Sequence, residues 1–158
     1  MKKQSQVLIN TLKQKKLSLA LAESMTCGLA AQRLSGCMGT SDVLKGSIVC
    51  YTPEMKRSLM HVSNKMIEQY ACESKEVTEA LAKNLPKLIK ADIYAAITGL
   101  ASPGGSETKE KPVGTVFFSV RKGKRIYNKR HVFRGSPLKI KKKACETLYR
   151  LILTVVEE

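Results

Sequence analysis

Residues 17–36 read LSLALAESMTCGLAAQRLSG, and this stretch decides the fold class. The apolar run over 17–23 predicts a buried strand, and the segment after it has leucine and alanine at helical spacing. We expect Thr26 to cap a helix that runs from about Cys27 to Leu34 and ends at a left-handed Gly36. A strand followed directly by a helix is typical of an α/β protein.

The alternation of strands and helices continues outward from this stretch in both directions. Further strands are predicted over residues 46–52, 91–101, 115–120 and 126–133. Helices are predicted over residues 2–16, 53–62, 74–90 and 137–158. Thr52 and Ser136 are expected to cap helices that begin with proline, and Pro86 is expected to kink or shorten its helix. The pattern predicts one α/β domain over 1–158, with α/β/α layers and a largely parallel or mixed sheet.

The chain carries a large positive charge, because 28 Lys and Arg residues oppose 13 Asp and Glu residues and give a net charge of +15. Such a field attracts anionic ligands. The basic runs contain no zinc-finger, basic-zipper or RNA-recognition pattern, and aromatic residues make up only 5% of the chain. A phosphate-bearing small molecule is therefore favoured as a partner over nucleic acid.

Targeting segments and metal-binding patterns are absent from the sequence. No apolar stretch approaches the length of a membrane span, and the first 16 residues form a polar amphipathic segment rather than a signal peptide. We expect a cytoplasmic protein without membrane association. The five cysteines are scattered, and neither histidine lies near a second soft ligand in the sequence. Reduced, mostly buried thiols are expected, with no metal site and no cofactor.

Ligands of open α/β sheets bind beyond the carboxyl ends of the strands, and three polar clusters occupy such positions. The first extends from Glu23 to Gly28, where Ser24 leaves a buried strand and the amides of Thr26, Cys27 and Gly28 open a helix. Those N–H groups suit a phosphate or a developing oxyanion. The nucleophile-elbow pattern GxSxG is absent, and an ordinary polar connection with a helix cap is the alternative.

The second cluster extends from Tyr51 to Lys56. Lys56 falls in the first turn of a predicted helix, where the positive end of the helix dipole disfavours another cation. If Lys56 is also buried, both effects favour the neutral amine, which can act as a general base toward a serine hydroxyl. Tyr51 can donate a hydrogen bond to the same site. The alternative is that Lys56 forms a surface ion pair with a nearby acid.

The third cluster extends from Thr98 to Gly105 and reads TGLASPGG. Gly99, Gly104 and Gly105 permit close backbone approach or positive φ angles. The segment matches neither the phosphate-binding Walker pattern nor the dinucleotide-binding pattern GxGxxG. By spacing alone it also fits a plain tight loop.

The three clusters, in this order, resemble the CinA C-terminal domain family of competence/damage-inducible proteins. The family motif AESCTGG appears as AESMTCG at 22–28, and GxVxYSNExK appears as GSIVCYTPEMK at 46–56. The motif S/T-G-I-A-G-P-G-G appears as TGLASPGG at 98–105, and EKPVGTV occurs unchanged at 110–116. The resemblance extends from about residue 17 to the end of the chain.

Stand-alone members of this family are nicotinamide mononucleotide amidohydrolases. The resemblance implies metal-independent hydrolysis of the carboxamide of that nucleotide to nicotinate mononucleotide and ammonia. It implies that Ser24 is the nucleophile and that Tyr51 and Lys56 form the polar pair that activates it. An arginine in the last helix of the family is expected at Lys141 or Lys142. The residues expected to contact the substrate are Glu23, Thr26, Cys27, Gly28, Gly99, Ser102, Gly104, Gly105, Lys141 and Lys142.

The chain departs from the family motifs at several positions. Cys27 and Ser102 replace glycines, so a Cβ enters where close approach is expected and can block the pocket. Lysine in place of the arginine keeps the charge but loses bidentate geometry. These departures support an alternative, a catalytically inactive member that binds a nucleotide or a protein partner. A further alternative makes Cys27 the nucleophile, and in either case a homo-oligomer is expected.

Overall fold

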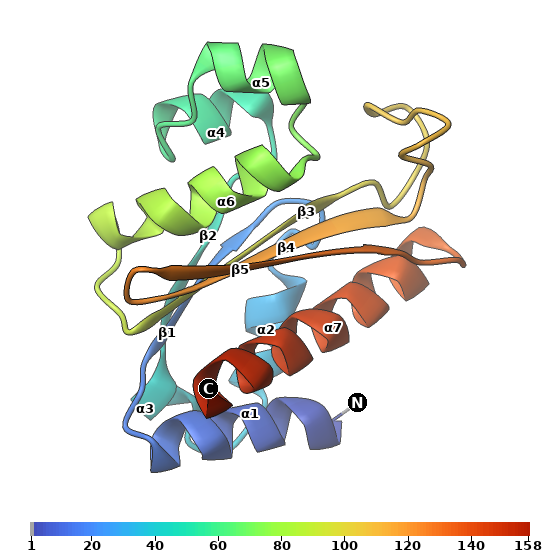
Figure 1. Cartoon of the computed structure of the whole chain (residues 1–158). Coiled ribbons are helices and arrows are strands. Elements are labelled where there is room, and N and C mark those ends of the chain that lie inside the picture. Colours follow the sequence, from blue (N-terminus) through green and yellow to red (C-terminus); the bar gives the residue numbers. More distant parts are fainter. Residues whose placement is uncertain (1) are drawn as a thin grey trace.

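The computed structural model describes residues 2–158 and contains a five-stranded sheet in the order β2-β1-β3-β4-β5. The strands are β1 (Leu19–Glu23), β2 (Leu44–Val49), β3 (Ile93–Gly99), β4 (Thr115–Lys122) and β5 (Arg125–Val132). β1 pairs in parallel with β2 and β3, whereas β3 with β4 and β4 with β5 are antiparallel. The sheet is therefore mixed. A tight turn joins β4 and β5 into an antiparallel hairpin (Figure 1).

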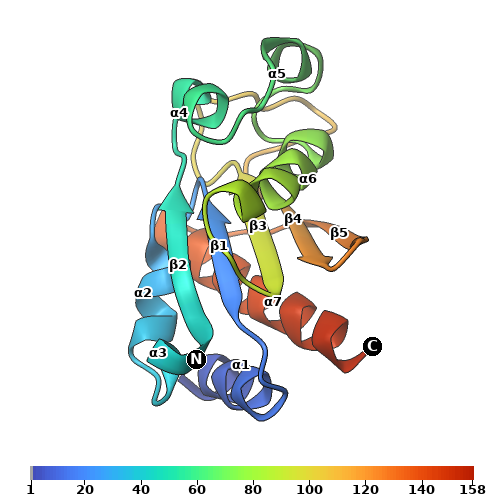
Figure 2. The same ribbon diagram turned by 90° about the vertical axis from the view of Figure 1, so that its left-hand side faces the viewer.

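Helices cover both faces of the sheet, as the views in Figure 1 and Figure 2 show. One face carries α1 (Lys2–Gln14), α2 (Leu29–Ser35), α3 (Thr40–Val43) and α7 (Pro137–Glu157). The other face carries α6 (Lys75–Asn84) and the 3₁₀ turn η1 (Leu85–Lys87), with α4 (Pro53–Ser58) and α5 (Asn64–Tyr70) beyond α6. The predicted α/β/α layers are confirmed.

The side chains of the central strands alternate between two apolar clusters. In β1, Leu19 and Leu21 belong to the cluster that includes α1 and α7, whereas Ala20 and Ala22 belong to the cluster that includes α6. β3 alternates in the same way along residues 93–97. Because both faces of the sheet are covered, β1 is buried along its whole length and reads as a continuous apolar run.

Most of the predicted helix ends are confirmed. The hydroxyl of Thr52 accepts from the N–H of Met55, and Ser136 caps α7 in the same way. α6 ends two residues before Pro86, which lies in η1. Gly36 does end α2, but its φ of −80° is not left-handed, so that part of the prediction is wrong.

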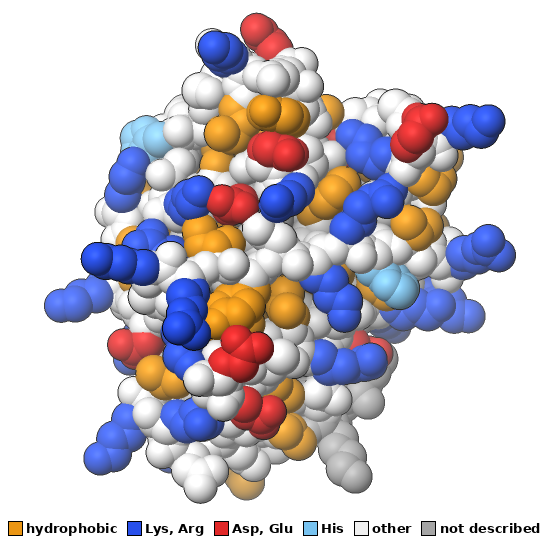
Figure 3. Space-filling model, in the orientation of Figure 1, with side chains coloured by type: hydrophobic (Ala, Val, Ile, Leu, Met, Phe, Trp, Pro, Cys, Tyr) orange, Lys and Arg blue, Asp and Glu red, His pale blue; other side chains and the backbone are white. Residues whose placement is uncertain are grey.

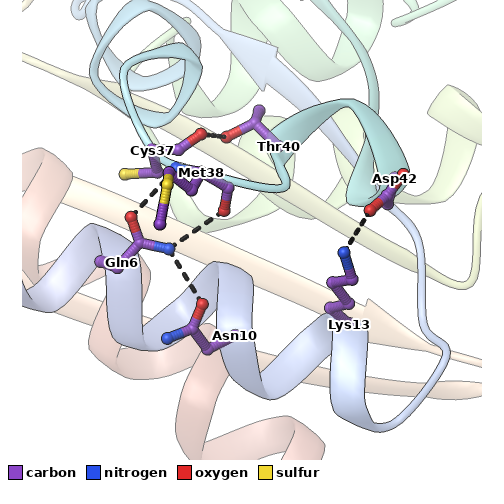
Figure 4. A network of polar contacts seen from close by, with 7 residues as sticks. All are labelled: Gln6, Asn10, Lys13, Cys37, Met38, Thr40 and Asp42. Carbon is purple, nitrogen blue, oxygen red and sulfur yellow. Dashed lines mark hydrogen bonds and ion pairs between the residues drawn. The ribbon is translucent and has the colours of Figure 1, made fainter.

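A polar network fastens α1 to the connection between α2 and α3, at the end of the molecule opposite α4 and α5 (Figures 1 and 4). The side-chain amide of Gln6 both donates to and accepts from the main chain of Met38, at 3.0 Å each. Lys13 and Asp42 form an ion pair with an N–O distance of 2.6 Å. Both halves of α1 are thereby bonded to the chain that follows α2.

The described residues include no helix that is long and apolar enough to cross a membrane. On the face drawn in Figure 3, lysine and arginine side chains are distributed over the whole outline, and acidic side chains lie between many of them. This face therefore carries no continuous cationic stripe of the kind that tracks a nucleic-acid backbone.

Candidate active site

The three polar clusters of the sequence meet at one edge of the sheet. Because β1, β2 and β3 are parallel, their carboxyl ends lie side by side at this edge. The N–H of Ser24 donates to the carbonyl of Ile97 at 3.1 Å, and the N–H of Cys50 donates to the carbonyl of Glu23 at 2.9 Å. These bonds fix the turn after β1 against both neighbouring strands.

Ser24 and Lys56 form a buried polar pair. The Nζ atom of Lys56 lies 2.9 Å from Ser24 Oγ, and the two residues are only 1% and 5% exposed. Nζ also donates to the carbonyls of Cys50, at 2.9 Å, and Tyr51, at 3.2 Å. Nζ thus donates to three oxygen atoms, and the contact with Oγ places the amine where it can exchange a proton with the Ser24 hydroxyl.

The surface ion pair considered for Lys56 is not present. None of the salt bridges among residues 2–158 involves Lys56. Its amine instead reaches back from α4 to the turn after β1, while its main chain belongs to a helix that Thr52 caps. The six-residue helix α4 thus places the amine of Lys56 in contact with the hydroxyl of Ser24.

Tyr51 contributes to this pair through its backbone. The hydrogen bond to Lys56 uses the main-chain carbonyl, and the side chain of Tyr51 is 58% exposed. The expectation that the phenol donates a hydrogen bond to the same site is therefore not met in this structure. Tyr51 nevertheless lies in the wall of the adjoining cavity.

Glu23 has an internal role that the sequence did not reveal. Its side chain is fully buried and accepts five hydrogen bonds. The donors are the hydroxyls of Thr26 and Ser47 and the N–H groups of Gly28, Ala30 and Ala31. A carboxylate satisfied in this way has no lone pair left for a ligand, and Glu23 does not line the cavity, so this geometry does not support the predicted substrate contact.

The start of α2 also differs from the prediction. α2 begins at Leu29, its N-cap is Gly28 with a φ of 90°, and the Thr26 hydroxyl bonds Glu23 instead of capping the helix. The N–H of Cys27 is taken by the carbonyl of Ser24, and that of Gly28 by Glu23. Two of the three amides expected to bind an anion are therefore occupied.

Two other amides of this turn remain available. Among the described residues 2–158, no acceptor pairs with the N–H of Met25 or Thr26. Met25 follows the candidate nucleophile and lies in the cavity wall. An amide directly after a nucleophile is a common oxyanion donor.

Cys27 lies outside the cavity wall. It is exposed, and its φ of 50° is in the left-handed region that favours glycine. The expectation of mostly buried thiols holds for Cys50 and Cys145, whereas Cys37 and Cys72 are partly exposed. Burial raises the pKa of Cys50 and raises that of Cys145 to about 12. All five thiols are free.

A cavity of about 340 Å³ opens next to Ser24. Its lining residues are Ser24, Met25, Tyr51, Glu73, Gly99, Leu100, Ala101, Ser102, Pro103, Gly104, Gly105, Pro137 and Lys141. The lining therefore includes the predicted contacts Gly99, Ser102, Gly104, Gly105 and Lys141. It lacks Glu23, Thr26, Cys27, Gly28 and Lys142.

Lys141 and Lys142 differ in their position relative to the cavity. Lys141 borders the cavity, whereas the carbonyl of Lys142 accepts a hydrogen bond from Arg33 on the side of α2. Arg33 also forms an ion pair with Glu146. The main chain of Lys142 therefore takes part in the contact between α2 and α7.

Glu73 lines the cavity and was missed by the sequence analysis. It lies in the connection between α5 and α6, so a search restricted to the carboxyl ends of strands could not find it. The oxygens of its side chain and main chain are joined to the loop over 102–114 through Ser106 and Lys111.

The glycines of the third cluster shape the cavity wall. A Cβ added at Gly99 would lie 2.7 Å from the carbonyl oxygen of Thr115, so this position needs glycine. Gly104 has a φ of 95°, and the N–H groups of Gly104 and Gly105 donate to the two carboxylate oxygens of Glu107 at 2.8 Å each. These bonds hold the pKa of Glu107 below its usual value. The two amides are consequently engaged within the loop.

Within residues 2–158, no group of three or more His, Cys, Asp or Glu side chains is placed to hold a metal ion. The chemistry that this arrangement offers is that of a serine with an adjacent buried amine. Such a pair supports nucleophilic attack on a carbonyl carbon followed by proton return to a leaving group.

Comparison with known proteins agrees with the resemblance seen in the sequence. The family described as "CinA C-terminal domain" matches residues 1–156. A CinA-like protein of Pseudothermotoga lettingae is 39% identical over 138 residues, which cover 82% of this chain and 34% of that protein. A CinA-like protein of Mycobacterium avium is 46% identical over 105 residues, which cover 66% of this chain and 24% of that protein. The chain thus spans about a third or less of the length of these curated relatives.

Solved structures share the fold. The crystal structure of a CinA superfamily protein from Escherichia coli has a TM-score of 0.90 at 27% identity, covering 96% of this chain and 88% of that one. The competence/damage inducible protein of Agrobacterium tumefaciens has a TM-score of 0.91 at 24% identity, covering 97% and 93%, which shows a common fold. From the match over residues 1–156 and from these relatives, the chain belongs to the CinA C-terminal domain family.

Proposed function

We propose that the protein is a metal-independent amidohydrolase that converts nicotinamide mononucleotide to nicotinate mononucleotide and ammonia. The observation that carries the proposal is the 2.9 Å contact between Ser24 Oγ and Lys56 Nζ, with both residues buried beside the cavity. Amide hydrolysis needs a nucleophile, a base that returns its proton to the leaving nitrogen, and donors for the tetrahedral oxyanion. This edge of the sheet offers all three.

Ser24 attacks first. The proton of its hydroxyl passes to Lys56, and Oγ bonds to the carboxamide carbon. The C–N bond then breaks as Lys56 returns the proton to the leaving nitrogen, which gives ammonia and a nicotinoyl ester on Ser24. The carbonyls of Cys50 and Tyr51 hold the amine in line with Oγ throughout.

Water completes the cycle. It adds to the ester carbon while Lys56 accepts its proton, and that proton returns to Oγ when the ester bond breaks. The N–H groups of Met25 and Thr26 are the donors we assign to the oxyanion of both tetrahedral intermediates. The net change is one amide and one water consumed, and one carboxylic acid and one ammonia formed.

Lys141 is the residue we assign to the phosphate of the substrate. It is the cation among the lining residues of the cavity, which otherwise has small, apolar and hydroxyl-bearing walls and one acid. A lysine binds phosphate as a point charge without the bidentate geometry of arginine. Binding is therefore expected to weaken as ionic strength rises.

The test is ammonia release from nicotinamide mononucleotide by the purified protein, compared with Ser24→Ala and Lys56→Met. We expect release by the wild type and a loss of about 10³-fold or more in each variant. The proposal fails if Ser24→Ala releases ammonia as fast as the wild type.

A catalytically inactive nucleotide-binding role is the second candidate. It is favoured by Ser102, which stands in the cavity wall where the family motif has glycine. A rise in Tm with the mononucleotide, but without ammonia, would support this role. Cys27 as nucleophile has less support, because Cys27 does not line the cavity.

A further inference from the structure

Glu73 is the only carboxylate among the lining residues of the cavity, and the proposed chemistry does not use it. It follows α5 and directly precedes Ser74, the N-cap of α6, so its main chain is held by a helix start. Its side chain is partly exposed. An acid in this position borders the cavity rather than the core.

The neighbouring loop over 102–114 fixes one side of this carboxylate. Ser106 Oγ donates to Glu73 Oε2, and Lys111 Nζ donates both to Ser106 Oγ, at 2.8 Å, and to the main-chain oxygen of Glu73, at 3.0 Å. Figures 1 and 2 show this loop at the same end of the molecule as α4 and α5. The side chain of Glu73 is thereby oriented before any ligand binds.

The other carboxylate oxygen is unoccupied by the protein. Within residues 2–158, no hydrogen bond reaches Glu73 Oε1, and Lys111 forms no ion pair with the carboxylate. An ionised carboxylate accepts hydrogen bonds and donates none. Oε1 is therefore available to accept a hydrogen bond from a donor group of a ligand, such as a hydroxyl.

The opposite charges of Lys141 and Glu73 favour one orientation of a ligand in the cavity. A phosphate is attracted to Lys141 and repelled by Glu73, so the anionic end and the hydroxyl-bearing end of a ligand take different parts of the cavity. A ribose between a base and a phosphate presents two neighbouring hydroxyl donors. Free nicotinamide has neither the hydroxyls nor the phosphate.

We propose that Glu73 accepts a hydrogen bond from a ribose hydroxyl and selects ribonucleotides over deoxy analogues. This inference rests on the proposed function for the identity of the nucleotide. Loss of a hydrogen bond to a charged acceptor lowers affinity by about tenfold to a hundredfold. The preference for the ribonucleotide is expected within that range.

The test is calorimetric binding of nicotinamide mononucleotide and of its 2′-deoxy and 3′-deoxy analogues to Ser24→Ala, which prevents turnover. We expect at least one analogue to bind about tenfold to a hundredfold more weakly than the ribonucleotide. The same comparison is made in Ser24→Ala combined with Glu73→Ala, with Glu73→Gln and with Ser106→Ala. Glu73→Ala should remove the preference, Glu73→Gln should reduce it, and Ser106→Ala, which keeps the carboxylate but removes the hydrogen bond that orients it, should lower the preference less than Glu73→Ala does.

Three outcomes overturn the inference. The first is equal affinity of Ser24→Ala, with Glu73 intact, for all three ligands. The second is an equal loss of affinity for all three ligands when Glu73 is substituted. The third is no binding of nicotinamide mononucleotide to Ser24→Ala. An equal loss of affinity for all three ligands is what a merely structural role of Glu73 predicts. If Glu73→Ala does not fold, the comparison is made with Glu73→Gln instead. Ammonia release by the wild type is measured separately, so the two proposals can fail independently. A ribose preference without ammonia release supports the role of Glu73 and rejects the proposed hydrolysis. Ammonia release without a ribose preference supports the hydrolysis and rejects the role of Glu73.

Discussion

Glu23→Gln is the substitution that best tests how the turn around Ser24 is held. It keeps the shape of the side chain but replaces one carboxylate oxygen with an NH₂ group. If the amide oxygen takes the place of Oε2, the NH₂ group faces the N–H of Ala31, which loses its acceptor. Ser47 can rotate its hydroxyl to accept from the new amide.

The expected loss of stability is about 3 kcal/mol. One buried N–H without a partner costs about 1–3 kcal/mol, and the three bonds to Oε2 weaken when a charged acceptor becomes neutral. For a chain of this length, a loss of that size lowers the Tm by roughly 6–12 °C. Because Gly28 and Ala30 anchor the start of α2 through these bonds, the proposed hydrolytic activity should fall as well.

The assay is urea unfolding followed by circular dichroism, since the chain has no tryptophan. The midpoint should shift with an unchanged slope. Ser47→Ala is the matched control, because it removes one of the five donors and leaves the carboxylate in place, and its expected cost is about 1 kcal/mol. A Glu23→Gln protein within about 0.5 kcal/mol of the wild type, the range of an ordinary surface substitution, refutes the reasoning.

Three further predictions follow from the same geometry. Lys56→Met should lower the kcat for the proposed hydrolysis by about 10³-fold or more and change the Kd for nicotinamide mononucleotide much less, because Lys56 does not line the cavity; steady-state kinetic and calorimetric measurements check this. Cys27→Gly should raise the free energy of unfolding by about 1 kcal/mol, because it relieves a left-handed φ of 50°, and an unchanged or lower urea midpoint would contradict this. An aromatic disulfide reagent at pH 8 should modify Cys27 first and Cys145 last, since burial raises the pKa of Cys145 to about 12; Cys27→Ser should remove the fast phase.

The layers of the fold and the meeting of the three clusters were predictable, because both follow from hydrophobic period and strand direction. The run over 17–23 is buried on both faces, and helix caps such as Thr52 have strong local preferences. The sequence left open whether the sheet is largely parallel or mixed, because it did not fix the direction of the last two strands. No helix separates β4 from β5, and a hairpin reverses direction there.

The roles of the two acids could not be read from local sequence. A carboxylate after a strand has the same local sequence whether it contacts a ligand or its own chain. Glu23 is a structural acceptor because the amides of Gly28, Ala30 and Ala31 and the hydroxyl of Ser47 converge on it. Glu73 lies between two helices and reaches the cavity only through tertiary packing. Both assignments depend on contacts between segments far apart in the chain.

The internal role of Glu23 also determines where a substrate anion can bind. A helix start after a parallel strand is an ordinary phosphate site, but here the chain's own carboxylate occupies the amides of Gly28, Ala30 and Ala31. Lys56 is held beneath Ser24 by three hydrogen bonds, which leaves Lys141 as the cation of the cavity wall. We therefore expect the proposed nucleotide substrate to bind with its phosphate toward α7 and its carboxamide toward the turn after β1, which is the orientation that the proposed attack by Ser24 requires.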